Sequence, residues 1–133
     1  MDVFAKRRAG ILLHPTSLPG SPGNGDLGQD AIRFVDFLAD NGVGLWQTLP
    51  LGPTHEDFSP YQCLSVHAGN TRLISLQTLV ECGWLDSAEL DESGDLDAQR
   101  KVRFSAAWNG FLSNASEHDR NAFSDFCHAH WRY

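Results

Sequence analysis

The spacing of hydrophobic residues over the first 50 positions predicts a strand, a helix and a second strand. Residues 9–14 are a short apolar run closed by Pro15, which is typical of a buried strand. Residues 29–41 carry apolar side chains at intervals of three and four, which predicts a helix with one apolar face. The residues of that face are Ala31, Phe34, Val35 and Leu38. Residues 43–49 form the second predicted strand. This order predicts a βαβ unit, in which a right-handed crossover joins two parallel strands.

Loops separate these elements. Residues 17–28 are rich in Gly and Pro, and Gly42 fits the C-terminal cap of the predicted helix. Residues 50–70 form a second loop of about 20 residues, a length that is usually functional or disordered. We therefore look for function first in residues 50–70.

The rest of the chain has a helical pattern. Residues 73–82 predict a short helix that Gly83 stops, and residues 86–95 are acidic and turn-like. Two longer helices are predicted over residues 97–114 and from residue 117 to the end. The pattern thus divides the chain into a βαβ portion with its loop, residues 1–70, and a helical segment, residues 71–133.

The last predicted helix begins at a capping box, because Ser116 is followed three residues later by Asp119. It carries one apolar stripe, made of Phe123, Phe126, Cys127, His130 and Trp131. The chain stops inside this stripe without a cap or a polar tail. Two strands also cannot close a sheet, so we expect the chain to be a fragment of a larger α/β protein.

Composition narrows the classes of function. The chain has 133 residues, 41% of them hydrophobic, so it can form a core. Its net charge of -7 disfavours nucleic acid as a partner. No apolar run is long enough for a membrane span, and no secretory leader pattern follows the basic N-terminus. Three widely spaced cysteines, Cys63, Cys82 and Cys127, suit free thiols in a reducing compartment. These features predict a cytoplasmic protein.

The loop of residues 50–70 carries the residue types that a sugar site uses, aromatic faces and short polar groups. Tyr61 follows Pro60 just beyond the end of a strand, where α/β folds bind ligands, so we assign it a binding role. Ser59, Gln62 and Asn70 are weaker candidates, because each could instead satisfy loop backbone. Trp46 lies within the second strand and is interpreted first as a core residue.

Three other motifs carry less weight. The run from Gly23 to Gly28 matches GxGxxG, but it begins well past the strand, and no acid follows the second strand to hold a ribose. His128 and His130 lie two apart on a helix and so point to different faces. Residues 55–57, His-Glu-Asp, have metal-type donors without a partner cluster. We predict no metal and no cofactor.

Ordered motifs run along the chain from residue 8 to residue 85. They begin with Arg8-Ala9-Gly10-Ile11-Leu12-Leu13-His14-Pro15-Thr16-Ser17-Leu18-Pro19-Gly20, Gly25-Asp26-Leu27-Gly28 and Phe34-Val35-Asp36-Phe37-Leu38-Ala39. They continue with Trp46-Gln47, Leu49-Pro50-Leu51-Gly52-Pro53-Thr54, Ser59-Pro60-Tyr61-Gln62, Ala68-Gly69-Asn70, Leu73-Ile74-Ser75-Leu76 and Gly83-Trp84-Leu85. In this order they resemble the N-terminal part of the 4-alpha-glucanotransferases (amylomaltase or disproportionating enzyme), glycoside hydrolase family 77. Beyond Leu85 only the helical character carries over.

This resemblance implies an α/β fold, the N-terminal part of a TIM (β/α)8-type barrel with a helical inserted subdomain, incomplete in this chain. It implies transfer of an α-1,4-glucan segment to the 4-hydroxyl of an acceptor by a retaining mechanism, without an organic cofactor. In this family the motif tyrosine, here Tyr61, lies against the sugar and the motif serine, here Ser59, lies nearby. The three catalytic carboxylates come from later strands, so we expect this chain alone to be inactive.

Some positions depart from the family pattern: Asn24, His67, Thr71 and the linker of residues 54–58. These departures leave loop detail and acceptor preference open. Two other classes also remain open. One is a stand-alone α-glucan-binding module without chemistry, and the other is a small nucleotide-binding domain that rests on the glycine run alone. Donor length, the formation of cyclic products and oligomeric state depend on parts of the protein outside this sequence.

Overall fold

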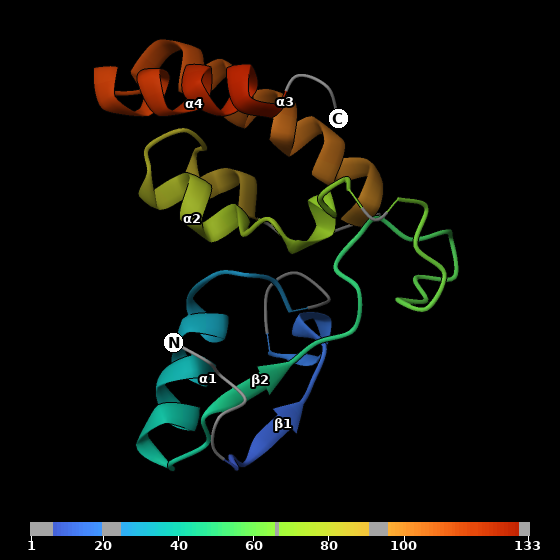
Figure 1. The fold of residues 1–133 in the computed structure, drawn as a ribbon. Helices are drawn as coiled ribbons and strands as arrows, with labels where there is room; N and C mark the ends of the chain where they lie inside the picture. Colours follow the sequence, from blue (N-terminus) through green and yellow to red (C-terminus); the bar gives the residue numbers. More distant parts are fainter. Residues whose placement is uncertain (1–6, 20–24, 66, 91–95, 131–133) are drawn as a thin grey trace. The chain divides into compact units, whose positions relative to one another are not determined.

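The structure is a computed structural model that describes residues 7–19, 25–65, 67–90 and 96–130, with side chains from residue 99 in the last range (Figure 1). Contacts divide the chain into two compact units, Met1–Ile74 and Ser75–Tyr133. The first unit holds the strands and one helix, and the second is helical. The assignment of the first 70 residues to the opening of a barrel stays a prediction.

The first unit is built around two parallel strands, β1 (Gly10–Leu12) and β2 (Leu45–Gln47). Ile11 pairs with Trp46 at the centre of the ladder. One further backbone bond lies beyond the paired strands, from Leu13 N–H to Gln47 O at 3.1 Å. The βαβ order and the parallel pairing are confirmed. Each strand is shorter than expected, because the chain leaves the ladder for a turn of 3-10 helix at Pro15–Ser17.

Helix α1 (Gln29–Asp40) joins the two strands (Figure 1). Its C-terminal cap is confirmed, since Gly42 has φ +70 and few side chains tolerate that angle. The apolar face is only partly buried. Ala31 and Leu38 are buried and Phe34 meets the Trp46 ring edge-on at 5.1 Å between centroids. Val35, expected on the same face, is 48% exposed within the described chain.

The second unit begins with a short helix, α2 (Leu76–Glu81), which starts three residues later than the sequence pattern suggests. Ser75 is the cause, because its extended backbone and its side chain, which accepts the Thr78 N–H at 3.4 Å, form an N-cap. Gly83 ends the helix with φ +73, as expected. A 3-10 turn at Ser87–Leu90 follows. The rest of the acidic segment, residues 91–95, lies outside the described residues.

Two long helices complete this unit, α3 (Leu96–Asn114) and α4 (Glu117–His130). The core between α2, the 83–90 segment and α3 is formed by Leu76, Leu85 and Ala107, with Phe104 packed against it. The capping box at the start of α4 is confirmed: Ser116 Oγ accepts the Asp119 N–H at 3.2 Å, and Asp119 Oδ2 accepts the Ser116 N–H at 3.3 Å.

The apolar stripe of α4 is less buried than its sequence suggests, and no residue of α4 in the described range is buried. Phe123 contacts the rings of Trp108 and Phe111, at 5.4 and 5.5 Å between centroids. Phe126 is 61% exposed and meets the His130 ring, while Cys127 is also exposed. Trp131 lies outside the described residues. Among the described residues, therefore, α4 meets the aromatic side chains of α3 through Phe123.

Candidate functional site

The carboxyl ends of β1 and β2 lie at the same edge of the sheet, because the strands are parallel. His14 lies just past β1 and Pro50 just past β2. The His14 Nδ1 lies 2.7 Å from the Thr16 hydroxyl and 3.4 Å from the Thr16 backbone nitrogen, while Nε2 lies 3.4 Å from the Pro50 carbonyl oxygen. The His14 ring therefore joins the two strand ends at the point where the long loop begins.

The loop of residues 50–70 is closed at its base. Thr54 and Cys63 form an antiparallel bridge, and the Leu64 N–H donates to the Pro53 carbonyl at 2.7 Å. The Cys63 thiol donates to the Pro60 carbonyl at 3.4 Å. Apart from this bridge, the described part of the loop contains no helix or strand, as the sequence predicts. Residues 55–62 thus form a loop whose two ends are held together by these backbone contacts.

Tyr61 lies in a tight turn of residues 59–62, which we call the Tyr61 turn. The Gln62 N–H donates to the Ser59 carbonyl at 3.1 Å and closes this turn. The three sequence-predicted site residues therefore belong to one turn. Tyr61 is 78% exposed and Gln62 is exposed, while Ser59 is half-buried. Among the described residues, the Tyr61 hydroxyl has no hydrogen-bond partner.

Asn70 and Trp46 have structural roles. The Asn70 side chain accepts the Arg72 N–H at 2.9 Å, so it caps a 3-10 turn, Thr71–Leu73. Trp46 is half-buried against Phe34 and donates its indole N–H to the Leu13 carbonyl at 2.8 Å. The structural interpretations of Asn70 and Trp46 are therefore supported, and the indole N–H is not available to a ligand.

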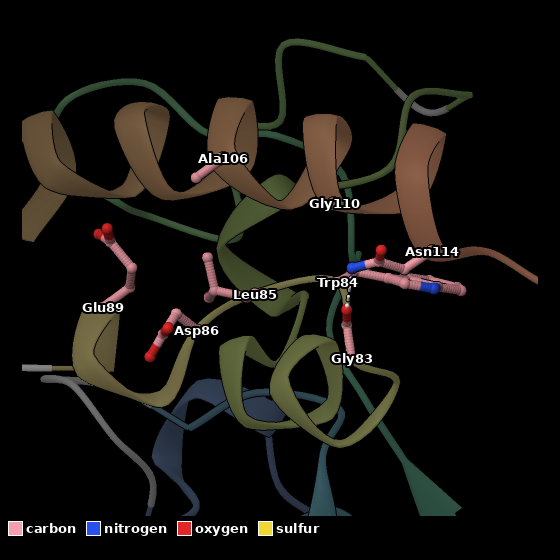
Figure 2. A pocket seen from close by; sticks show the side chains of 8 residues that line it. All are labelled: Gly83, Trp84, Leu85, Asp86, Glu89, Ala106, Gly110 and Asn114. Carbon is pink, nitrogen blue, oxygen red and sulfur yellow. Dashed lines mark hydrogen bonds between the residues drawn. The ribbon is translucent and has the colours of Figure 1, made fainter.

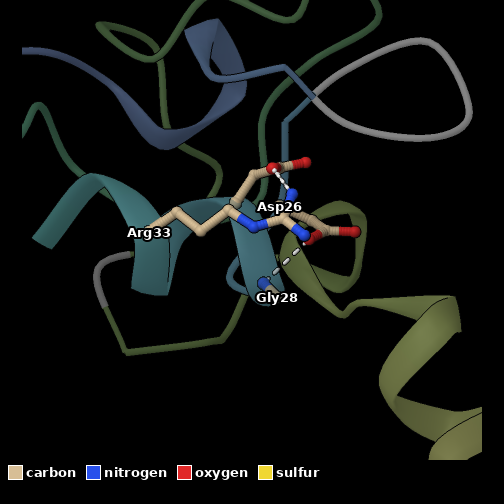
Figure 3. A network of polar contacts seen from close by, with 4 residues as sticks. Asp26, Gly28 and Arg33 are labelled. Atoms are coloured by element: carbon tan, nitrogen blue, oxygen red, sulfur yellow. Dashed lines mark hydrogen bonds and ion pairs between the residues drawn. The ribbon is translucent and has the colours of Figure 1, made fainter. Parts of the chain in front are cut away.

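The glycine run serves the turn before α1. A Cβ added at Gly25 would lie 2.2 Å from the Pro15 carbonyl oxygen, so the backbone approaches too closely for any side chain. Asp26 Oδ1 accepts the Gly28 N–H at 2.8 Å, while Arg33 forms an ion pair with Asp30 at 2.9 Å (Figure 3). Gly23 and Asn24 lie outside the described residues.

Two open hollows lie elsewhere in the molecule. In the first unit, a hollow of about 450 Å³ lies at the amino end of β2 and is lined by apolar residues that include Val35, Leu38 and Val43. In the second unit, a hollow of about 400 Å³ runs between the 83–89 segment and α3 (Figure 2). Tyr61, Ser59 and Gln62 line neither of the two.

The polar groups of the second hollow are largely engaged. Figure 2 shows Asn114 beside Trp84, and the Asn114 amide donates to the Gly83 carbonyl at 3.1 Å. Asp86 accepts the Ala88 N–H at 2.9 Å. The side chains of Asn114 and Asp86 in this hollow therefore bond to backbone groups of the 83–89 segment.

Metal-type residues do not converge in the described part of the chain, where no group of three or more His, Cys, Asp or Glu side chains could hold an ion. Asp57 instead accepts the Ser59 N–H at 3.1 Å, and His128 Nδ1 lies 2.7 Å from the Ser124 carbonyl oxygen. The three cysteines are free thiols. No helix in the described ranges has the length and apolar character that a membrane crossing requires.

Sequence reasoning missed three residues that shape the loop. Asp57 had a usable signal, since an Asp two residues before Ser59 is the pattern of an Asx turn. His14 had a weaker signal, a polar ring at a strand end. Phe58 had none, because its role depends on Arg72, whose guanidinium carbon lies 3.8 Å from the centroid of the Phe58 ring.

Comparison with known proteins agrees with this architecture. The family model described as 4-alpha-glucanotransferase matches residues 13–132. A 4-alpha-glucanotransferase of Synechocystis is 42% identical over 93% of this chain and 26% of its own length. The corresponding protein of Thermus thermophilus is 43% identical over 90% of this chain and 25% of its own length.

A solved structure is also similar. The amylomaltase from Streptococcus agalactiae in complex with acarbose superposes with a TM-score of 0.80 at 35% identity, over 93% of this chain and 27% of that one. The chain belongs to the 4-alpha-glucanotransferase family. It spans about a quarter of the length of the two relatives named here.

Proposed function

We propose that this chain is the N-terminal portion of a 4-alpha-glucanotransferase, which transfers a segment of an α-1,4-glucan to the 4-hydroxyl of an acceptor glucan or glucose. Membership of the family supports the activity. The observation that supports the site is the Tyr61 turn, which follows the carboxyl ends of two parallel strands. It presents an exposed ring and a hydroxyl that has no hydrogen-bond partner among the described residues. Ligands of parallel α/β folds bind at that edge.

The barrel is the second part of this proposal. β1, α1 and β2 form one βαβ unit, which is the repeating unit of a TIM-type barrel. The likeness to an amylomaltase over 93% of this chain supports the same assignment. We infer that the helical unit, Ser75–Tyr133, belongs to a subdomain inserted after the second strand. Three free thiols support a reducing compartment, so we also propose that the protein works in the cytoplasm.

Each residue of the Tyr61 turn has a chemical part in this proposal. The Tyr61 ring offers an apolar face to a pyranose, and its hydroxyl can donate to or accept from a sugar hydroxyl. Ser59 adds a second hydroxyl at the other end of the turn, and the Gln62 amide offers a donor and an acceptor. The substrate is accordingly an α-1,4-glucan or a maltooligosaccharide.

Removing the Tyr61 ring should weaken glucan binding. We expect Tyr61→Ala to reduce the affinity of the chain for maltoheptaose about tenfold, equivalent to about 1.4 kcal/mol. Tyr61→Phe keeps the apolar face and should lose less. Isothermal titration calorimetry measures both variants. Phe126→Ala is the control, since this ring is also exposed but belongs to α4. Equal affinities for wild type and Tyr61→Ala would contradict the assignment of Tyr61.

The 133-residue chain by itself should not catalyse transfer. The family resemblance assigns the catalytic carboxylates to later strands, and Asp57, beside the Tyr61 turn, accepts the Ser59 N–H. We expect maltotriose incubated with the pure chain to remain unchanged by chromatography, while the Synechocystis relative serves as the positive control. Glucose and longer maltooligosaccharides from the pure chain would overturn this expectation. Glucan binding without transfer is also the behaviour expected of a non-catalytic α-glucan-binding fragment.

A further inference from the structure

Phe58 has an unusual backbone conformation at the entry to the Tyr61 turn. It is the non-glycine residue with positive φ in the described chain, at φ 55. A side chain disfavours this left-handed region, which glycine occupies freely. Phe58 closes one turn, because its N–H donates to the His55 carbonyl at 3.0 Å, and Ser59 opens the next. The conformation of Phe58 therefore sets the direction in which the chain enters the Tyr61 turn.

The Phe58 ring, which is 52% exposed, has a contact with Arg72. The Arg72 guanidinium carbon lies 3.8 Å from the centroid of the Phe58 ring, well within the range of a cation–π interaction. The backbone of Arg72 is fixed, because its N–H donates to the Asn70 side chain at 2.9 Å within the 3-10 turn Thr71–Leu73. The ring of Phe58 is thus held by a residue on the far side of the loop, fourteen positions along the chain.

The Tyr61 side chain lacks a comparable contact. Among the described residues it forms no hydrogen bond, and it is 78% exposed. The direction of the Tyr61 side chain is therefore set by the backbone of residues 59–62 and by the residues that fix this backbone. The Asp57 side chain holds the Ser59 N–H at 3.1 Å, and the Phe58 ring is the next side chain along. Loss of the Phe58 contact should free the turn to rotate.

We propose that Phe58 and Arg72 are positioning residues for Tyr61: the guanidinium holds the Phe58 ring, the ring holds the left-handed backbone, and that backbone aims the Tyr61 side chain at the sugar. This inference deepens the proposed function and rests on it for the sugar, but not for the conformation.

The conformational part can be tested without any ligand. The chain contains two tyrosines, Tyr61 and Tyr133, so incorporation of 3-fluorotyrosine gives two fluorine resonances, and Tyr133→Phe assigns them. We expect Phe58→Ala and Arg72→Met each to shift and sharpen the Tyr61 resonance, because the ring gains mobility. The double variant should differ little from either single one, since both substitutions remove the same contact.

Conservative variants separate positioning from folding. Phe58→Tyr keeps a ring and Arg72→Lys keeps a cation, so both should retain the wild-type Tyr61 resonance, whereas Arg72→Met keeps the length but not the charge. Arg33→Gln is the matched control, an exposed arginine of α1 in the same unit. Should Phe58→Ala fail to fold by circular dichroism, the contrast between Arg72→Lys and Arg72→Met decides the question. An unchanged Tyr61 resonance in Arg72→Met would overturn the proposal, as would additive effects in the double variant.

The binding part uses maltoheptaose as the probe. We expect Phe58→Ala and Arg72→Met to lose affinity about fivefold, and Arg72→Lys to restore most of it. If the wild type binds maltoheptaose and these variants lose no affinity, the proposal that Phe58 and Arg72 position Tyr61 for the sugar is wrong. If wild type itself does not bind while the fluorine resonance responds as expected, the proposed sugar site fails and the conformational role of the pair stands.

Discussion

Replacing Gly110 by alanine should destabilise the helical unit, although alanine is the better helix former. A Cβ at this position would lie 2.0 Å from the carbonyl oxygen of Trp84 and 3.0 Å from its Cα, so α3 packs directly on backbone. Backbone atoms cannot rotate away as a flexible side chain can. Overpacking costs about 1–3 kcal/mol, and here we expect the upper end. The helix propensity of alanine offsets about 1 kcal/mol of this. The net loss in the free energy of unfolding is therefore about 2 kcal/mol.

Urea unfolding followed by circular dichroism and tryptophan fluorescence measures this loss. Trp84 and Trp108 belong to the affected unit, whereas Trp46 belongs to the other. Asn109→Ala is the control, because it places the same new residue one position away on an exposed part of α3. It should leave stability within about 0.5 kcal/mol. A midpoint for Gly110→Ala equal to or above that of wild type would show that α3 can move away from the Trp84 backbone.

The second large effect is expected at Gly52, in the base of the loop that carries Tyr61. A Cβ here would lie 2.2 Å from the Ser65 carbonyl oxygen. Gly52→Ala must push the returning arm of the loop outward, which breaks the bond between the Leu64 N–H and the Pro53 carbonyl and the adjoining bridge of Thr54 with Cys63. We expect the affinity for maltoheptaose to fall tenfold or more, a loss of at least about 1.4 kcal/mol.

Gly69→Ala is the matched control for Gly52→Ala. It lies in the same loop, but a Cβ at Gly69 would meet no atom within 4 Å. Its affinity for maltoheptaose, measured by titration calorimetry, should equal that of wild type. The helical content should also be preserved in both variants, because the clash lies outside the helices. Retained affinity in Gly52→Ala would mean that the base of the loop does not hold the Tyr61 turn.

The elements that the sequence predicts well are those fixed by local chemistry. Helix α1 has both a three- and four-residue spacing and a glycine where positive φ is needed, and the structure confirms its length to one residue. The capping box at Ser116 is equally local. The start of α2 was misplaced because Leu73 and Ile74 fit a helical spacing, while the Ser75 cap outweighs that spacing.

Burial is predicted less well, because it depends on partners far apart in the sequence. Val35 and Phe126 lie on apolar faces by spacing, yet both are exposed in the described chain. A hydrophobic spacing states which face a helix can bury, and it does not state whether another element covers that face.

The candidate site shows the same division. Pro60 and the strand end before residue 50 were enough to predict that Tyr61 lies in a loop after the strand, whereas its binding role stays a prediction. The grouping of Ser59, Tyr61 and Gln62 in one turn follows from their adjacency. The contact of Phe58 with Arg72 has no local signature, because an aromatic residue and an arginine fourteen positions apart meet only after both loop arms have folded.

Cys63 has a consequence for how the protein can be labelled. Its sulfur lies 3.4 Å from the Pro60 carbonyl oxygen and 3.8 Å from that of Gly52, so an attached dye would occupy the space beneath the turn. Cys82 and Cys127 are exposed and belong to the helical unit. A maleimide fluorophore or spin label that must leave the Tyr61 turn undisturbed therefore belongs at one of these two cysteines, in a background where Cys63 is serine.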